Sequence, residues 1–221
     1  YKRETVEKVY ELIEKDFREG YPLIKDEVYN VPKYHFTEAA AAAFASRFYL
    51  YKGEWDSVVH YANIALGANP RLKIRELKGP SFNQPDKDLY QYRYFGSDQA
   101  SPLLMICCTS NWCGDFSSSS LRYGMTKEVN DSVIVRKNIC TGKVGANYTY
   151  YVLSAYNNDR VQLRKFYEHR AYTTPTSTTF RRQTVGPMLM AEDVLLNRAE
   201  AYVMLGKFDS ALKDINLLLS E

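Results

Sequence analysis

The sequence predicts a mainly α-helical fold, in which helical hairpins form a scaffold around a long irregular insertion with short strands. Apolar residues recur at helical period through residues 192–219, with Gly206 between two helical segments. Residues 45–66 repeat this pattern at a constant offset of 153 positions. Between the two hairpins, residues 69–187 lose the helical period and are rich in proline, serine and asparagine. Because each hairpin needs an apolar partner, we expect one domain over residues 1–221.

The composition argues against some classes of partner. The chain has 29 basic and 26 acidic side chains, a formal charge of +3 that is too small to indicate a nucleic acid. Its 19 tyrosines offer apolar faces with hydroxyl edges, which favours polar ligands. Apolar runs fall far short of the roughly 20 residues of a membrane-spanning helix. The charged first residues are no signal peptide, and we expect an N-terminal part to precede them.

The first expected helix covers residues 5–18, with Thr5 as its N-cap and Gly20 and Pro22 at its end. Its apolar face consists of Val6, Val9, Tyr10, Ile13 and Phe17. After a connecting loop, Thr37 caps a second helix over residues 38–52. The five alanines at 39–43 leave room for another helix to approach closely.

Gly53 ends the second helix, and a third follows over residues 54–67. This helix is expected to bury Trp55, Val58, Val59, Ala62 and Leu66. Trp55 is interpreted as a packing residue rather than a ligand platform, because Phe208 holds the equivalent apolar position in the second hairpin. Six matched pairs define the repeat: Tyr49 with Tyr202, Gly53 with Gly206, Trp55 with Phe208, Asp56 with Asp209, Ser57 with Ser210 and Leu66 with Leu219.

The insertion contains candidate strands. Residues 103–108 form a short apolar run that predicts a buried strand, as does the run at 133–135. Residues 148–156 fit a strand or a helix, and residues 173–184 suit an extended surface segment. Insertions of this length usually carry function. We therefore divide the chain into a helical scaffold at 1–68, a loop-rich ligand-binding insertion at 69–187 and a scaffold hairpin at 188–221.

The sequence predicts neither a metal site nor a cofactor. The four cysteines, Cys107, Cys108, Cys113 and Cys140, fit no standard zinc spacing, and they are expected to be reduced or to form one disulfide. The three histidines, His35, His60 and His169, form no H-E-x-x-H motif, and His60 is interpreted as a surface or packing residue.

An enzyme is not predicted either. The chain lacks the G-x-S-x-G elbow, the phosphate-binding P-loop and the G-x-G-x-x-G fingerprint. Asp115 and Glu128 could be paired as glycosidase carboxylates, but with 26 acidic residues such a pair arises by coincidence.

Two sets of residues carry a family resemblance. The residues Tyr202, Leu205, Gly206, Phe208, Ala211 and Leu212 resemble the turn of a tetratricopeptide repeat. Two copies 153 residues apart are not a solenoid. Together with V9-Y10-x-x-I13-x-x-D16 and E192-D193-V194-L195-L196-N197-R198-A199-E200-A201, they make the chain similar to the SusD/RagB family, the nutrient-binding lipoproteins of the Bacteroidetes outer membrane.

This resemblance implies a tetratricopeptide-like scaffold and a variable part that binds oligosaccharide, or sometimes peptide. It also implies a SusC-like TonB-dependent transporter as partner, and surface exposure on the outer membrane. Attachment would be peripheral, through a lipid anchor that is not present in these 221 residues.

The loop at residues 109–123 is the predicted sugar site. Sugars ask for an aromatic face against the pyranose ring and for planar polar groups beside its hydroxyls. The candidates are Asn111, Trp112, Asp115, Arg122 and Tyr123. Trp112 is the strongest single candidate, although its side chain could instead pack within its own loop against the helices. Tyr90, Tyr92 and Tyr94 alternate at strand spacing and could line a second wall or pack in a core.

We therefore expect non-catalytic binding of a nutrient oligosaccharide, for delivery to a TonB-dependent transporter. The alternative is a tetratricopeptide-like module that binds a partner protein or peptide. The sequence leaves the ligand open, because the scaffold is shared within the family while the binding loops differ.

Overall fold

The structure is a computed structural model that describes residues 3–75, 96, 98–109, 153–154, 161–162 and 167–220. The chain forms two compact units. The helical unit comprises Tyr1–Ile74, Ala100–Leu104 and Met188–Ser220, and the insertion unit comprises Arg75–Gln99 and Met105–Pro187. The single domain expected from the sequence stays a prediction.

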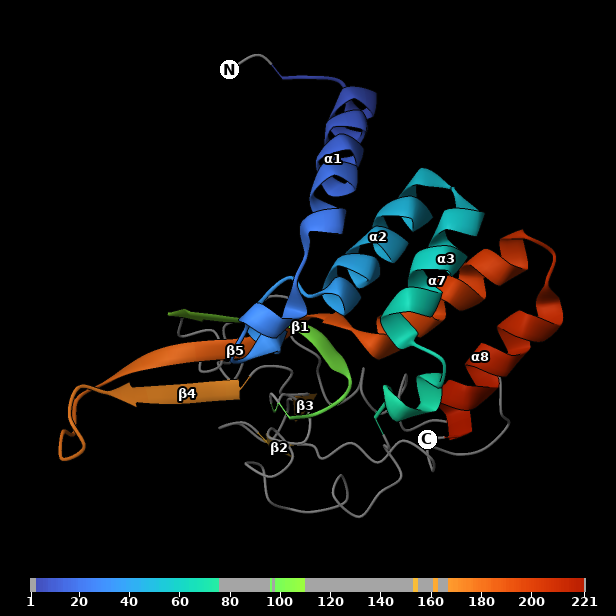
Figure 1. Ribbon diagram of the computed structural model, residues 1–221. Helices are drawn as coiled ribbons and strands as arrows, with labels where there is room; N and C mark the ends of the chain where they lie inside the picture. The colour runs from blue at the N-terminus through green and yellow to red at the C-terminus, as the bar shows by residue number, and fades with distance from the viewer. Residues whose placement is uncertain are drawn as a thin grey trace. The chain divides into compact units, whose positions relative to one another are not determined.

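Five α-helices occur among the described residues, and all belong to the helical unit (Figure 1). They are α1 (Val6–Gly20), α2 (Glu38–Lys52), α3 (Trp55–Leu66), α7 (Ala191–Met204) and α8 (Phe208–Ser220). The last four lie side by side, since α3 contacts both α2 and α7, and α7 contacts α8. The predicted mainly α fold is confirmed. None of the described helices is both long and apolar enough to cross a membrane.

The helix boundaries follow from local capping chemistry. Thr5 Oγ1 accepts a hydrogen bond from Lys8 N, and Thr37 Oγ1 accepts one from Ala40 N, so both predicted N-caps are confirmed. Gly53 caps the C-terminal end of α2, and Gly206 lies in the turn after α7. Their φ angles of 78° and 72° fall in the left-handed region that glycine tolerates.

The two hairpins share one turn geometry. Glu54 N donates to Tyr49 O at 3.0 Å, and Lys207 N donates to Tyr202 O at 2.7 Å. Both bonds span five residues and are characteristic of the Schellman motif. The repeat inferred from the sequence is therefore present in the backbone as well.

Small residues let the helices approach closely. Four consecutive alanines of α2, at positions 40–43, are almost completely buried, which confirms the predicted close packing. One core cluster joins α2, α3 and α7, and it consists of Ala42, Ala43, Ala62, Ala65, Leu66, Ile74, Leu103, Leu189, Ala191, Val194 and Leu195. A second cluster consists of Ala45, Phe48, Tyr49, Val58 and Ala201.

Helix α1 packs on this second cluster through Tyr10, Ile13 and Phe17. Tyr10 stacks on Phe48 with ring centroids 5.3 Å apart. Val6 and Val9, which were predicted on the same buried face, are exposed instead. The N-terminal turns of α1 therefore contribute little to the core.

The hairpins differ in the burial of their second helices. In α3, Val58, Ala62 and Leu66 are buried, and Trp55 is half-buried against the second cluster, which confirms its packing role. Phe208, the equivalent of Trp55 in α8, is exposed. The apolar stripe predicted for α8 is thus only partly covered.

Short strands occupy the described part of the insertion. Strands β1 (Pro102–Thr109), β5 (Phe180–Met190) and β4 (Tyr167–Tyr172) form a sheet in the order β1-β5-β4. β4 and β5 are antiparallel, with Tyr167 opposite Val185 and Tyr172 opposite Phe180. β2 (Leu153–Ser154) pairs antiparallel with β3 (Val161–Gln162).

These strands test three of the four predictions made for the insertion. The strand at 103–108 is confirmed as β1, but its predicted burial is wrong beyond Met105, because Ile106, Cys107 and Cys108 are exposed. Within 148–156, only β2 is described, as a strand. The segment 173–184 contains the turn of the β4–β5 hairpin and the start of β5. The strand predicted at 133–135 lies outside the described residues.

Candidate functional site

The predicted sugar site falls in the part of the chain that the structure leaves undescribed. Asn111, Trp112, Asp115, Arg122 and Tyr123 all lie outside the described residues. The same holds for the second-wall candidates Tyr90, Tyr92 and Tyr94, for Glu128, and for Cys113 and Cys140. The loop at 109–123 therefore stays a predicted site.

The start of β1 is fixed to the first turn of α7. Ser101 and Glu192 are both buried, and the Ser101 hydroxyl donates a hydrogen bond to Glu192 Oε2. The backbone repeats the connection, since Ala191 N donates to Ser101 O at 2.9 Å. A carboxylate in the first turn of a helix is also favoured by the helix dipole. Glu192, a residue of the SusD/RagB-like motif at 192–201, therefore fixes the chain at Ser101, directly before β1.

A buried arginine joins three helices. Arg198 of α7 donates from Nε and Nη2 to the two carboxylate oxygens of Asp214 in α8, at 2.8 and 2.7 Å. Its Nη1 donates to Asn63 Oδ1 of α3 at 2.7 Å. Both charged side chains are about nine-tenths buried. A fork-to-fork pair of this kind satisfies the guanidinium and the carboxylate together, so that Arg198 fixes the register of α3, α7 and α8.

Two further motif residues also serve the scaffold. Asn197 Nδ2 donates to Ser46 Oγ at 3.3 Å, and Asp193 pairs with Arg47 at 3.2 Å between Oδ2 and Nη2. Both contacts connect α7 to α2. Asp193, Asn197 and Arg198 thus hold α7 to neighbouring helices, while Glu192 holds α7 to the residue before β1.

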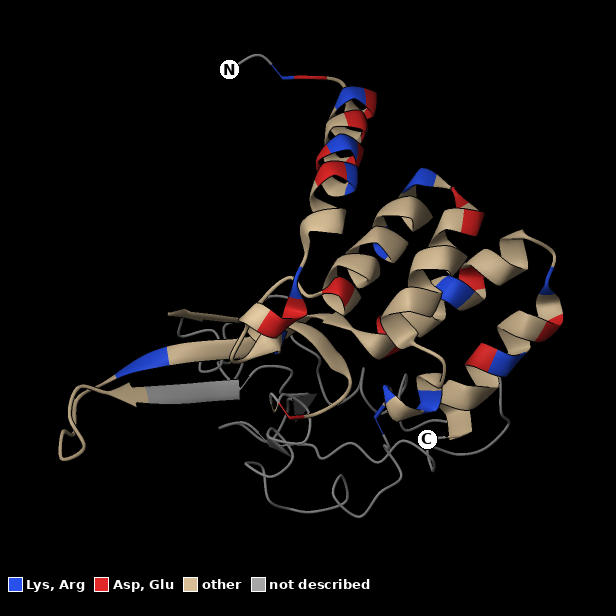
Figure 2. Ribbon diagram, in the orientation of Figure 1, with Lys and Arg blue, Asp and Glu red and all other residues tan. Residues whose placement is uncertain are grey.

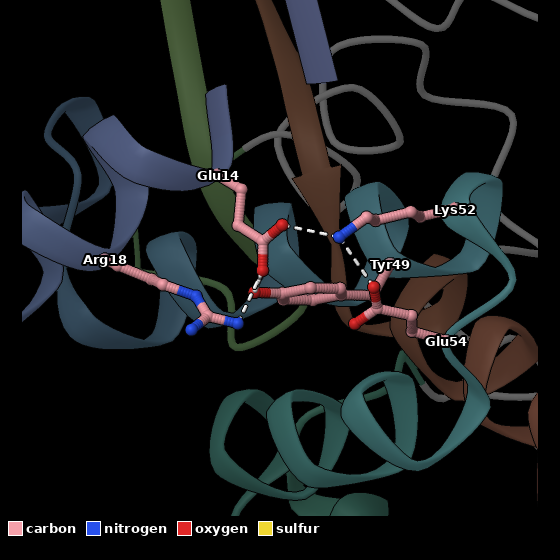
Figure 3. A network of polar contacts seen from close by, with 5 residues as sticks. All are labelled: Glu14, Arg18, Tyr49, Lys52 and Glu54. Atoms are coloured by element: carbon pink, nitrogen blue, oxygen red, sulfur yellow. Dashed lines mark hydrogen bonds and ion pairs between the residues drawn. The ribbon is translucent and has the colours of Figure 1, made fainter. Parts of the chain in front are cut away.

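A polar network ties α1 to the turn of the first hairpin (Figure 3). Glu14 of α1 accepts from Lys52 Nζ at 2.5 Å and from Arg18 Nη2 at 2.6 Å. The Tyr49 hydroxyl donates to Glu14 Oε1 at 3.2 Å. Lys52 also pairs with Glu54 at 2.6 Å. Glu14 therefore stands at the centre of a network that joins α1, the C-terminal end of α2 and the residue before α3.

The protonation of this network favours ion pairing. The hydrogen bond from Lys52 lowers the pKa of Glu14 against the opposing effect of burial. The hydrogen bonds to Glu14 and Glu54 raise the pKa of Lys52, and burial raises the pKa of Tyr49. A general acid at neutral pH would instead need a carboxyl with a raised pKa. The network therefore ties α1 to the first hairpin through ion pairs.

An aromatic loop precedes α2, and sequence reasoning treated it only as a connection. It contains three short 3-10 helices, η1 (Tyr21–Leu23), η2 (Asp26–Val28) and η3 (Pro32–Tyr34). Tyr29 and His35 stack with centroids 4.1 Å apart and planes 5° apart. The density of aromatic residues just before the Thr37 cap was the signal available in the sequence.

Both ends of this loop are anchored. Asp26 Oδ1 accepts from Glu38 N at 2.9 Å, and Tyr21 packs on Phe17 and Tyr61 with centroids 5.2 and 5.8 Å away. Burial is the main cause that raises the pKa of Tyr21 to about 12. Between the anchors, the rings of Tyr34 and Phe36 are exposed. The loop thus offers aromatic faces on a fixed backbone, a surface suited to apolar or ring-stacking contacts.

The remaining chemistry-bearing residues form no reactive cluster among those described. Cys107 and Cys108 are exposed free thiols, and His60 is an exposed ring packed edge-on against Tyr61. In the described part of the chain, no three histidine, cysteine or acidic side chains are grouped to hold a metal ion.

Acidic and basic residues are interspersed along α1 (Figure 2).

Comparison with known proteins places these observations in a family context. Residues 1–50 match a SusD-like family described as starch-binding and associating with the outer membrane. None of the curated proteins matches the sequence.

Two solved structures share the fold. A SusD-like protein from Bacteroides fragilis aligns with 97% of this chain and 52% of its own, at a TM-score of 0.59 and 15% identity. A SusD-like carbohydrate-binding protein from Bacteroides vulgatus aligns with 97% of this chain and 44% of its own, at a TM-score of 0.54 and 14% identity. The chain thus spans about half the length of these proteins. The resemblance to SusD/RagB proteins is confirmed in sequence over the first 50 residues and in fold over nearly the whole chain.

Proposed function

We propose that this chain, which has the SusD-like fold, binds a nutrient oligosaccharide at the outer membrane and catalyses no reaction on it. The observation that carries the proposal is the match of residues 1–50 to a family described as starch-binding, joined to the shared fold. One of the structures with this fold is itself described as carbohydrate-binding. Starch-derived oligosaccharides are therefore the first ligands to test.

The bound sugar is proposed to lie against the loop at 109–123. The polar motif residues of α7 are less suited to hold the sugar, because their side chains already contact other scaffold elements. These residues are Glu192, Asp193, Asn197 and Arg198. Trp112 would cover the apolar face of a sugar ring, and Asn111, Asp115 and Arg122 would pair with hydroxyls. Tyr123 would add a second aromatic face.

Delivery completes the proposed role. The chain would be peripheral to the membrane through a lipid anchor and exposed at the cell surface. A SusC-like TonB-dependent transporter would receive the sugar. Both statements extend the family description of association with the outer membrane.

The test is a calorimetric titration with a panel of linear starch-derived oligosaccharides, other plant and host glycans, and short peptides. Trp112→Ala is compared with wild type, and Tyr51→Ala serves as the matched control because Tyr51 is a 76% exposed aromatic at the end of α2. Loss of an aromatic anchor at a binding site costs about 2 kcal/mol, so Trp112→Ala should weaken binding by about 30-fold.

Each result has a distinct meaning. Weakening by Trp112→Ala with unchanged affinity in Tyr51→Ala supports the site. Unchanged affinity in both variants removes Trp112 from the site while sugar binding stands. Failure of the wild type to bind any glycan contradicts the proposed function.

A further inference from the structure

Positive charge is concentrated around the β4–β5 hairpin. Residues 161–190, which run from the start of β3 to the end of β5, contain five basic side chains and one acidic side chain, a net charge of +4. The whole chain carries +3, so the rest of it is close to neutral. No acidic residue occurs in the sequence 169–190. Figure 2 shows the basic stretch of β5 near the turn, and this charge favours an anionic partner.

Two aromatic rings and a guanidinium share one face of this hairpin. Tyr172 lies opposite Phe180 in the last pair before the turn, and their ring centroids are 5.6 Å apart. Arg182 lies two residues after Phe180, which places it on the same side of β5. Its Cζ is 6.0 Å from the centroid of the Phe180 ring, within the range of a cation–π contact. We name Tyr172, Phe180 and Arg182 the hairpin face.

The hairpin face is accessible to a ligand. Tyr172 is 53% exposed and Arg182 is exposed, while Phe180 is half-buried between them. The edge of the aromatic pair and the guanidinium therefore point to a surface where a ring and an anionic group can be held side by side.

Hydrogen bonds within the turn fix the strand ends that carry this face. The Ser177 hydroxyl oxygen accepts from Thr173 Oγ1 at 2.9 Å and from Thr179 N at 3.0 Å. Ser177 N donates to Thr174 O at 3.0 Å, and Thr173 N donates to Thr179 O at 3.4 Å. A turn with this many internal bonds holds Tyr172 and Phe180 in place before a ligand arrives, which lowers the entropic cost of binding.

The chemistry of the hairpin face fits an acidic sugar. Aromatic rings cover the apolar side of a pyranose, and a guanidinium donates in pairs to a sulfate or a carboxylate. A neutral sugar would use the rings but not the positive charge. A lipid headgroup would use the charge but not the rings. The combination therefore favours a sugar that carries an oxyanion.

We propose that the hairpin face is a second glycan-binding site, selective for sugars that carry a sulfate or a carboxylate. The sugar ring packs on Tyr172 and Phe180, and its oxyanion accepts hydrogen bonds from Arg182. This inference rests on the proposed function in taking the anionic partner to be a sugar chain. It differs in the class of ligand and in location, because the hairpin face lies outside the loop at 109–123.

The test is a calorimetric titration of the intact chain with hexasaccharides of chondroitin sulfate and of polygalacturonic acid, and with neutral maltohexaose. At least one acidic sugar should bind saturably, and its binding should weaken between about 0.05 and about 0.5 M sodium chloride, because salt screens exposed charges. Tyr172→Ala and Arg182→Gln should each weaken this binding by about tenfold. Neither should change the affinity for maltohexaose.

Arg181→Gln is the matched control for Arg182→Gln. Arg181 is equally basic and exposed, but it is the next residue along β5 and so lies on the opposite side of the strand. Its substitution removes the same net charge and should change the affinity for the acidic sugar by less than about twofold. The three substituted positions are at the surface, so each variant should retain the wild-type circular dichroism spectrum.

Three results would overturn the proposal. The first is binding of maltohexaose but of neither acidic sugar, which would leave the proposed function standing. The second is equal weakening by Arg181→Gln and Arg182→Gln, which would show a diffuse basic surface rather than a site. The third is binding to phosphatidylglycerol vesicles that an excess of the acidic sugars does not reduce, which would identify a membrane surface as the partner. Absence of binding to every glycan would contradict the proposed function as well.

Discussion

Replacing Asp214 by alanine leaves the Arg198 guanidinium buried without a counter-charge. The two side chains are only 10 and 8% exposed, and two hydrogen bonds of 2.8 and 2.7 Å join them. Asn63 would still accept one hydrogen bond, but it carries no charge. Removing one partner of a buried pair costs about 3–5 kcal/mol. Against a typical unfolding free energy of about 5–15 kcal/mol, this is a large fraction of the stability.

Urea denaturation followed by far-ultraviolet circular dichroism measures this loss. With a slope of about 2 kcal/mol per molar urea, the midpoint should fall by about 1.5–2.5 M. Asp209→Ala is the matched control, because Asp209 is an exposed carboxylate in the same helix, and its loss should cost no more than about 1 kcal/mol.

A double substitution separates the cost of leaving one buried charge unpaired from the net contribution of the ion pair to stability. Replacing both partners, as Arg198→Met with Asp214→Leu, removes both buried charges and should recover most of the stability. A loss below about 1 kcal/mol for Asp214→Ala would refute the reasoning, because that is the value of a solvent-exposed ion pair.

Two further changes test the scaffold. Gly206→Ala should destabilise the chain by about 1 kcal/mol, because the φ of 72° at Gly206 strains any other residue, although a Cβ there would meet no atom within 4 Å. Gly20→Ala is the matched control: Gly20 has a right-handed helical backbone and equally open space, so this substitution should stabilise the chain by about 0.5–1 kcal/mol. Equal effects of the two substitutions on thermal unfolding would exclude backbone strain as the cause. The pKa of Glu14 is lowered in the folded state by Lys52, so its ion pairing contributes in full above the unfolded pKa of about 4.3 and is lost as the pH falls through the folded value. Glu14→Gln should therefore be less stable than wild type by about 1 kcal/mol at pH 7, and this difference should shrink as the pH falls through the lowered pKa of Glu14. A difference that does not shrink on acidification would contradict the assignment.

The helices could be predicted because the signals that end them are local. Thr5 and Thr37 each bond to a backbone N–H three residues away, and Gly53 and Gly206 each supply a backbone conformation that other residues resist. Such signals need no knowledge of the tertiary structure. The boundaries predicted from the sequence consequently agree with the structure to within a few residues.

Other features depend on contacts between distant residues. Asn63 and Arg198 are 135 positions apart, and nothing in either local sequence indicates that they meet. The apolar stripe of α8 was visible in the sequence, but periodicity alone does not say whether a neighbour covers it. The exposure of Cys107 in β1 was missed for the same reason, because an apolar run reports composition and not which side of a strand is covered.

The candidate site likewise has one part that could be predicted from the sequence and another that depends on tertiary contacts. The role of Trp112 rests on residue chemistry and on resemblance to the SusD/RagB family, and it stays a prediction. The aromatic loop with Tyr29 and His35 was overlooked, because its stacking depends on three short 3-10 helices that have no simple periodic signal. The scaffold role of Arg198 emerged only from its contacts.

The measurement that tests the central claim most directly is calorimetric titration of the wild-type chain with starch-derived oligosaccharides, followed by chromatography of the recovered sugar. The account predicts saturable binding and recovery of the sugar at its original length after prolonged incubation. Shortened sugar would contradict the non-catalytic role. Absence of binding to every glycan would contradict the proposed function itself.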